Sequence, residues 1–101
     1  MFRILVVEDD ISLSDSIKIF LSKKGYQVFC SYSAKYALME LDKYQVDLII
    51  TDIMMPTIDG ITFIKEVRNM EIKVPILIIS AKDQFIDKEA GFKAGADDYM
   101  V

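Results

Sequence analysis

Histidine is absent from the 101 residues of this chain, and cysteine occurs once, at Cys30. Without histidine the chain offers no imidazole base, no histidine metal ligand and no phosphohistidine. A single cysteine cannot form an internal disulfide, which fits a reducing cytosol. The sequence has no run of about 18 uncharged apolar residues, and the apolar part of its N-terminus is too short for a secretory signal. We therefore expect a cytoplasmic chain with no membrane partner.

Positive charge is also scarce. The chain has 12 Lys and Arg residues against 16 Asp and Glu residues, for a formal net charge of −4, and no basic run. This balance argues against nucleic-acid binding by this segment itself. With 52% apolar and 28% charged residues, the composition is that of a globular chain, and its length supports one domain.

Short apolar runs alternate with helical patterns along the chain. The runs predict strands at residues 2–7, 26–32, 47–52, 74–80 and 98–101. Helical spacing predicts four helices between these strands, the fourth at residues 84–94. Gly25 is expected to end the first helix, and Ser33 to cap the second. The residues that define the first three helices are Leu13, Ile17, Phe20, Leu21, Ala37, Leu38, Leu41, Ile61, Ile64, Val67 and Arg68. Strict alternation predicts an α/β fold with a parallel sheet and helices on both faces.

Carboxylates follow two of the predicted strands. The first strand ends in Glu8, Asp9 and Asp10, and the third ends in Asp52. If these strands are neighbours, the carboxylates meet at one sheet edge, and like charges within about 4 Å would repel by a few kcal/mol. A hard divalent cation, Mg²⁺ or Mn²⁺, would relieve this repulsion. The alternative is that these acids are ordinary polar strand ends, with Asp10 capping the first helix.

Taken together, four motifs resemble the receiver domain of two-component response regulators. They are Val6-Val7-Glu8-Asp9-Asp10, then Asp52-Ile53-Met54-Met55-Pro56 with Asp59-Gly60, then Ser80-Ala81-Lys82, and finally Gly95-Ala96-Asp97-Asp98-Tyr99. The motifs span the whole chain in order and at family-like spacing. The last one resembles the subfamily with a C-terminal winged-helix DNA-binding domain.

The resemblance implies a role for each matched residue. Asp52 would be the phosphoryl acceptor. Asp9, Asp52 and the backbone carbonyl of Met54 would bind Mg²⁺ (or Mn²⁺) directly, and Glu8 through water. Ser80 would be the switch hydroxyl and Tyr99 the switch aromatic, although each by itself is also typical of a polar strand end or a half-buried ring.

The resemblance also implies the fold and the partners. The fold would be flavodoxin-like, a doubly wound parallel sheet with strand order 2-1-3-4-5. The partners would be a sensor histidine kinase, a second copy bound through the fourth helix and fifth strand, and DNA contacted only through a missing C-terminal domain.

The chain departs from the family pattern at its end. The family has a lysine three residues after the Tyr99 position, followed by a proline, and that position lies just past Val101. We therefore expect residues 1–101 to be one receiver (phosphoacceptor) domain, C-terminally incomplete and truncated before its last helix.

Other functions are open on the sequence alone. A Mg²⁺-dependent phosphohydrolase of similar topology could use Asp52 as its nucleophile, although Ile53 and the two methionines after it replace the second acid that such enzymes usually carry. A flavin-binding module would be repelled by the acids at residues 8–10. A receiver domain without phosphorylation chemistry, used only for interaction, is a third alternative.

Overall fold

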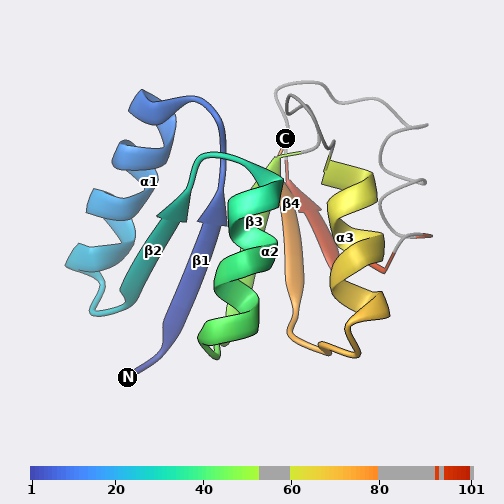
Figure 1. Cartoon of the computed structure of the whole chain (residues 1–101). Helices are drawn as coiled ribbons and strands as arrows, with labels where there is room; N and C mark the ends of the chain where they lie inside the picture. Colours follow the sequence, from blue (N-terminus) through green and yellow to red (C-terminus); the bar gives the residue numbers. More distant parts are fainter. Residues whose placement is uncertain (53–59, 80–92, 94, 101) are drawn as a thin grey trace.

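The computed structural model describes residues 1–52, 60–79, 93 and 95–100, with residues 98–100 described by their backbone alone. Its elements alternate as the sequence predicts (Figure 1). In chain order they are β1 (Arg3–Val7), α1 (Ile11–Lys23), β2 (Gln27–Ser31), α2 (Ala34–Lys43), β3 (Leu48–Asp52), α3 (Gly60–Asn69), β4 (Ile76–Ile79) and β5 (Asp98–Met100). The helix predicted at residues 84–94 falls almost entirely outside the described residues.

The five strands form one parallel sheet in the order β2-β1-β3-β4-β5. The predicted strand order is therefore confirmed. The chain moves from β1 outward to β2, then returns past β1 to β3, so the direction of winding reverses between β1 and β3. In sheets of this kind, ligands bind beyond the carboxyl ends of the strands at this reversal.

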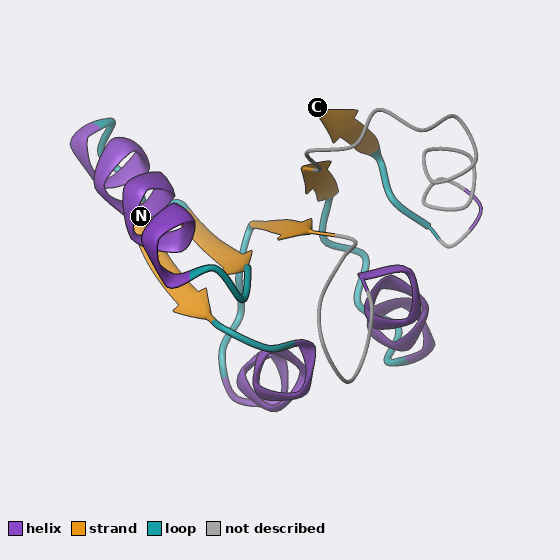
Figure 2. Cartoon of the chain, turned by 90° about the horizontal axis from the view of Figure 1, so that it is seen from above, coloured by secondary structure: helices purple, strands orange, loops and turns teal. Residues whose placement is uncertain are grey.

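Helices cover both faces of the sheet. Seen from above, α1 lies on one face, and α2 and α3 lie on the other (Figure 2). Alternate residues of β1 point to the two faces, so Leu5 and Val7 join the core beneath α2 and α3, while Ile4 and Val6 join the core beneath α1. After the exposed Arg3, the first strand is apolar because both of its faces are buried.

The helix ends follow the predicted capping pattern. The Ser33 hydroxyl accepts a hydrogen bond from the backbone N–H of Tyr36, at 3.2 Å, and so caps α2. Gly25 follows the end of α1 with φ of +96°, a conformation that glycine adopts without steric strain. Both predicted helix boundaries are confirmed.

The residues at helical spacing in α1 are not all buried. Leu13 and Phe20 of α1 are 44% and 61% exposed, whereas Ile17 and Leu21 pack on the core. The reason is the position of α1, which sits toward the β2 side of its face. Leu13 and Phe20 therefore border an apolar groove of about 470 Å³, whose floor is Ile50, Leu77 and Ile79.

The third helix also differs from its predicted pattern. Phe63, which the spacing did not single out, is completely buried, whereas Ile61 is only partly buried. Arg68 is 24% exposed but is not part of the apolar core. Glu71, just after the helix, has φ of +62°, and its N–H donates to the Arg68 carbonyl at 3.0 Å. This left-handed residue ends α3 in a place where glycine is more common.

Candidate phosphoacceptor site

Three carboxylates meet at the winding reversal of the sheet. Glu8 and Asp9 directly follow β1, Asp52 is the last residue of β3, and Val7 and Thr51 are paired in the register of these two strands. Glu8, Asp9 and Asp52 each offer a carboxylate oxygen, and these oxygens lie within 4.8 Å of one another. The predicted convergence of the first and third strand ends is therefore confirmed.

Glu8 is the most deeply buried of the three acids. Its side chain is buried, its N–H donates to the Ser31 carbonyl at 3.0 Å, and its Oε1 accepts from the Asp10 N–H at 3.0 Å. Its Oε2 is buried and has no hydrogen-bond partner among the described residues. Asp9 is exposed and Asp52 is half-buried. The site therefore combines one buried acid with two that solvent can reach.

Burial dominates the electrostatics of Glu8. The pKa of its carboxyl is raised to about 8, chiefly because the group is removed from water, and the charge of Asp52 and the proximity of the Asp52 and Asp9 carboxyls contribute to the same rise. The Asp10 N–H partly opposes this rise. Without a cation, Glu8 therefore keeps its proton at neutral pH. A bound divalent cation would favour the ionised form.

Asp10 does not belong to the cluster. Its Oδ1 accepts from the N–H of Leu13 at 3.1 Å, and its carbonyl accepts from the N–H of Ser14 at 2.9 Å. It is therefore the N-cap of α1, as the sequence indicates. By holding the start of α1, Asp10 also keeps its own N–H directed at Glu8.

The donor set suits a hard cation. All three side chains offer oxygen, and the buried Oε2 of Glu8 has no hydrogen-bond partner among the described residues. These properties fit Mg²⁺, which binds through one or two carboxylates and keeps several waters.

The structure describes only one of the remaining predicted site residues, Tyr99, and only its backbone. Met54 and Ser80 lie outside the described residues. Tyr99 lies in β5, paired with Ile78, and its backbone alone is described.

Two features of the structure were not predicted: the deep burial of Glu8 in this site, and a cluster of polar contacts around Arg68 at the opposite end of the sheet, beside β5. The sequence carries one signal of the contacts around Arg68: this residue is charged, although the helical spacing predicts an apolar residue at its position.

A doubly wound parallel sheet with three acids at its winding reversal defines a class of α/β domains whose ligands bind beyond the carboxyl ends of the strands. Within that class, residues 4–101 match the family described as "Response regulator receiver domain". The chain belongs to this family. It is thus a receiver domain of the two-component type, a phosphorylation-dependent switch. This regulatory family gives no support to the phosphohydrolase alternative.

Curated relatives agree with this family. Regulatory protein VanR of Enterococcus faecium is 39% identical over 99 residues, which are 98% of this chain and 42% of that protein. The alkaline phosphatase synthesis transcriptional regulatory protein PhoP of Bacillus subtilis is also 39% identical, over 98% of this chain and 41% of that protein. The chain thus spans about two-fifths of the length of these relatives.

Solved structures agree in fold. The response regulator TrrA of Thermotoga maritima, solved in complex with Mg²⁺-BeF, matches with a TM-score of 0.91 and 31% identity, over 100% of this chain and 86% of that chain. A two-component response regulator from Clostridium difficile matches with a TM-score of 0.96 and 26% identity, over 100% of this chain and 83% of that chain. Among the described residues, no helix has the length and apolar character that crossing a membrane requires.

Proposed function

We propose that Asp52 accepts a phosphoryl group from a sensor histidine kinase, in a reaction that depends on Mg²⁺. The observation that carries this proposal is the convergence of Glu8, Asp9 and Asp52, whose carboxylate oxygens lie within 4.8 Å of one another at the carboxyl ends of β1 and β3. Family membership supports the same chemistry.

Phosphoryl transfer to Asp52 requires only one bond to form and one bond to break. A carboxylate oxygen of Asp52 bonds to phosphorus, while the bond from phosphorus to the donor imidazole nitrogen breaks and the nitrogen keeps the electron pair. A bound Mg²⁺ supplies charge neutralisation for the phosphoryl oxygens. Asp9, Asp52 and the backbone carbonyl of Met54 would hold the ion directly, and Glu8 through water; Mn²⁺ has the same ligand preferences. The domain turns over no substrate beyond its own phosphorylation and dephosphorylation.

The output would follow from the new charge. An acyl phosphate at Asp52 carries close to two negative charges and presents oxygens that a Ser80 hydroxyl can bind. A rearrangement of Ser80 and Tyr99 would bias the face formed by the fourth helix and fifth strand toward a homodimer. The dimer would in turn control a C-terminal DNA-binding domain, a proposal supported by relatives whose names describe transcriptional regulatory proteins. The protein would act in the cytoplasm.

The test is chemical phosphorylation followed by intact-mass measurement. Acetyl phosphate with Mg²⁺ should add one phosphoryl group to the wild-type protein, and chelation of the metal should prevent the addition. Asp52→Asn should abolish the adduct. Asp42→Asn is the matched control, because Asp42 is an exposed residue of α2 far from the site in sequence, and it should leave the adduct intact. An adduct that survives in Asp52→Asn would refute the assignment.

A further inference from the structure

The last strand of the sheet is short and lies at an edge. β5 spans Asp98–Met100 and pairs with β4 alone, through Leu77 with Asp98, Ile78 with Tyr99 and Ile79 with Met100. Three residue pairs of parallel ladder provide few hydrogen bonds, and a slip of one residue would exchange the two faces on which the side chains of β5 project. Contacts outside the ladder must therefore hold the register of β5.

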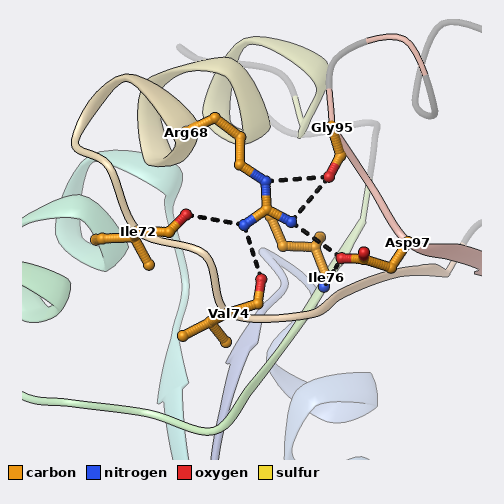
Figure 3. Close-up of polar contacts among 6 residues, drawn as sticks. All are labelled: Arg68, Ile72, Val74, Ile76, Gly95 and Asp97. Atoms are coloured by element: carbon orange, nitrogen blue, oxygen red, sulfur yellow. Dashed lines mark hydrogen bonds and ion pairs between the residues drawn. The ribbon is translucent and has the colours of Figure 1, made fainter.

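Arg68, in the last turn of α3, makes such contacts (Figure 3). Its Nε and Nη2 donate to the Gly95 carbonyl at 3.1 and 2.8 Å, and its Nη1 donates to the carbonyls of Ile72 and Val74 at 2.9 and 2.8 Å. Its Nη2 also donates to Asp97 Oδ2 at 2.9 Å. These five bonds match the five N–H donors of a guanidinium group. We call this set of residues the Arg68 cluster.

Asp97 connects the Arg68 cluster to the start of β4. The oxygen that accepts from Arg68 also accepts from the Ile76 N–H at 2.8 Å, and the Asp97 N–H donates to the Ile76 carbonyl at 2.9 Å. Both backbone polar groups of Ile76 are thus bound by the residue that immediately precedes β5. A one-residue slip of β5 would break both of these bonds and the bond to Arg68.

Gly95 lets the Arg68 side chain approach. The φ of Gly95 is +122°, and a Cβ at this position would lie 2.8 Å from Cγ and 3.1 Å from Nε of Arg68. Any larger residue would therefore displace the guanidinium group from the Gly95 carbonyl. Lysine at position 68 would also be a poor substitute, because its single nitrogen cannot reproduce a planar fork that reaches carbonyls on opposite sides.

We infer that Arg68 is a positioning residue that fixes the register of β5 against β4, and thereby keeps Tyr99 paired with Ile78. The role of this pairing in signalling rests on the proposed function, in which Tyr99 responds to phosphorylation of Asp52. The cluster lies at the amino ends of β4 and β5, whereas the acids lie at the carboxyl ends of β1 and β3, so Arg68 acts through β5 and does not touch the reacting group.

The first test measures register and local protection by NMR without phosphorylation. In Arg68→Lys, amide exchange at Ile76 and Asp97 should accelerate roughly 10- to 100-fold, because several charged hydrogen bonds are lost. The cross-strand contacts between Ile78 and Tyr99 should weaken or be replaced by those of a shifted pairing. The Gln27 amide, which donates to the Phe2 carbonyl at 3.0 Å on the far side of the sheet, should keep its exchange rate.

Arg3→Lys is the matched control. Arg3 is exposed at the start of β1, and its guanidinium makes one long contact, 3.5 Å, to the Gln45 carbonyl. This variant should leave the Ile76 and Asp97 amides unchanged. Asp97→Asn keeps the shape of the cluster and removes its charge, so it should accelerate the same two amides by a smaller factor even if Arg68→Lys does not fold. Equal acceleration of all slow amides, with the Ile78–Tyr99 contacts intact, would overturn the inference.

A second test separates this inference from the proposed function. With acetyl phosphate and Mg²⁺, Arg68→Lys should still gain one phosphoryl group, because the acids are untouched, while the change in the Tyr99 resonances on phosphorylation should be reduced or lost. If the wild-type protein gains no phosphoryl group, the proposed function is refuted, but the NMR test of the β5 register, which needs no phosphorylation, can still be interpreted. A full, wild-type response of Tyr99 in Arg68→Lys would overturn the role assigned to Arg68.

Discussion

Glu8 makes the stability of the protein depend on pH in a direction opposite to that of most carboxylates. Its pKa is about 8 in the fold against an ordinary value of 4.5, because burial disfavours the charged form. The folded state therefore holds this proton more tightly than the unfolded state does. The stabilisation is fully present below about pH 4.5 and is lost as the pH rises through about 8.

The magnitude follows from the two pKa values. Each unit of difference is worth about 1.36 kcal/mol, so the rise from 4.5 to about 8 corresponds to about 5 kcal/mol of unfolding free energy lost over the whole titration in the absence of a divalent cation. Glu8→Gln removes the ionisation and keeps the shape of the side chain. The stability of this variant relative to wild type should therefore rise by about 4 kcal/mol between about pH 5 and about pH 8.5, a range that covers most of the titration.

Urea unfolding followed by circular dichroism, in the presence of a metal chelator, gives the required free energies. Glu66→Gln is the matched control, because Glu66 is exposed on α3, and its stability difference from wild type should be flat across the same range. Saturating Mg²⁺ should restore stability to the wild type at alkaline pH and do less for Glu8→Gln. If wild type and Glu8→Gln lose stability in parallel with rising pH, the assignment of this titration to Glu8 is refuted.

Three further changes test the packing and the helix ends, each by urea unfolding. Asp10→Ala should lower the unfolding free energy by about 1 kcal/mol, because the Leu13 N–H loses its cap; no loss would contradict the capping role. Glu71→Gly should raise the unfolding free energy by about 1 kcal/mol by relieving the left-handed backbone at φ +62°, and a decrease would argue against it. Phe63→Ala should lower the unfolding free energy by about 3 to 5 kcal/mol, since Phe63 is completely buried beneath the sheet; a loss under 1 kcal/mol would show that the cavity collapses.

The elements of the fold are predictable because their signals are local. Apolar runs locate β1 and β3, Gly25 and Ser33 mark helix ends, and the carboxylates at the strand ends predict the site. These patterns depend only on which residues are neighbours along the chain, and the strand order then follows from the family resemblance.

What could not be predicted depends on residues distant in sequence. Glu8 has a raised pKa because the fold buries its side chain and brings Asp52 close to it, and no property of the Glu8-Asp9-Asp10 run reports that burial. Phe20 fits the helical spacing as well as Leu21 does, but the placement of α1 on the sheet leaves Phe20 exposed. Arg68 occupies an apolar position of its helix because its partners, among them Gly95 and Asp97, come much later in the chain.

The central place of β1 has a consequence for how the protein is made. β1 pairs with β2 on one side and with β3 on the other. The edge of β1 that faces β3 therefore has no partner strand until residues 48–52 have emerged from the ribosome. The same pairing event brings Asp52 beside Glu8 and Asp9. The nascent chain therefore brings its three acids together at the moment when it completes the middle of its sheet, and divalent ions available at that stage would favour the step.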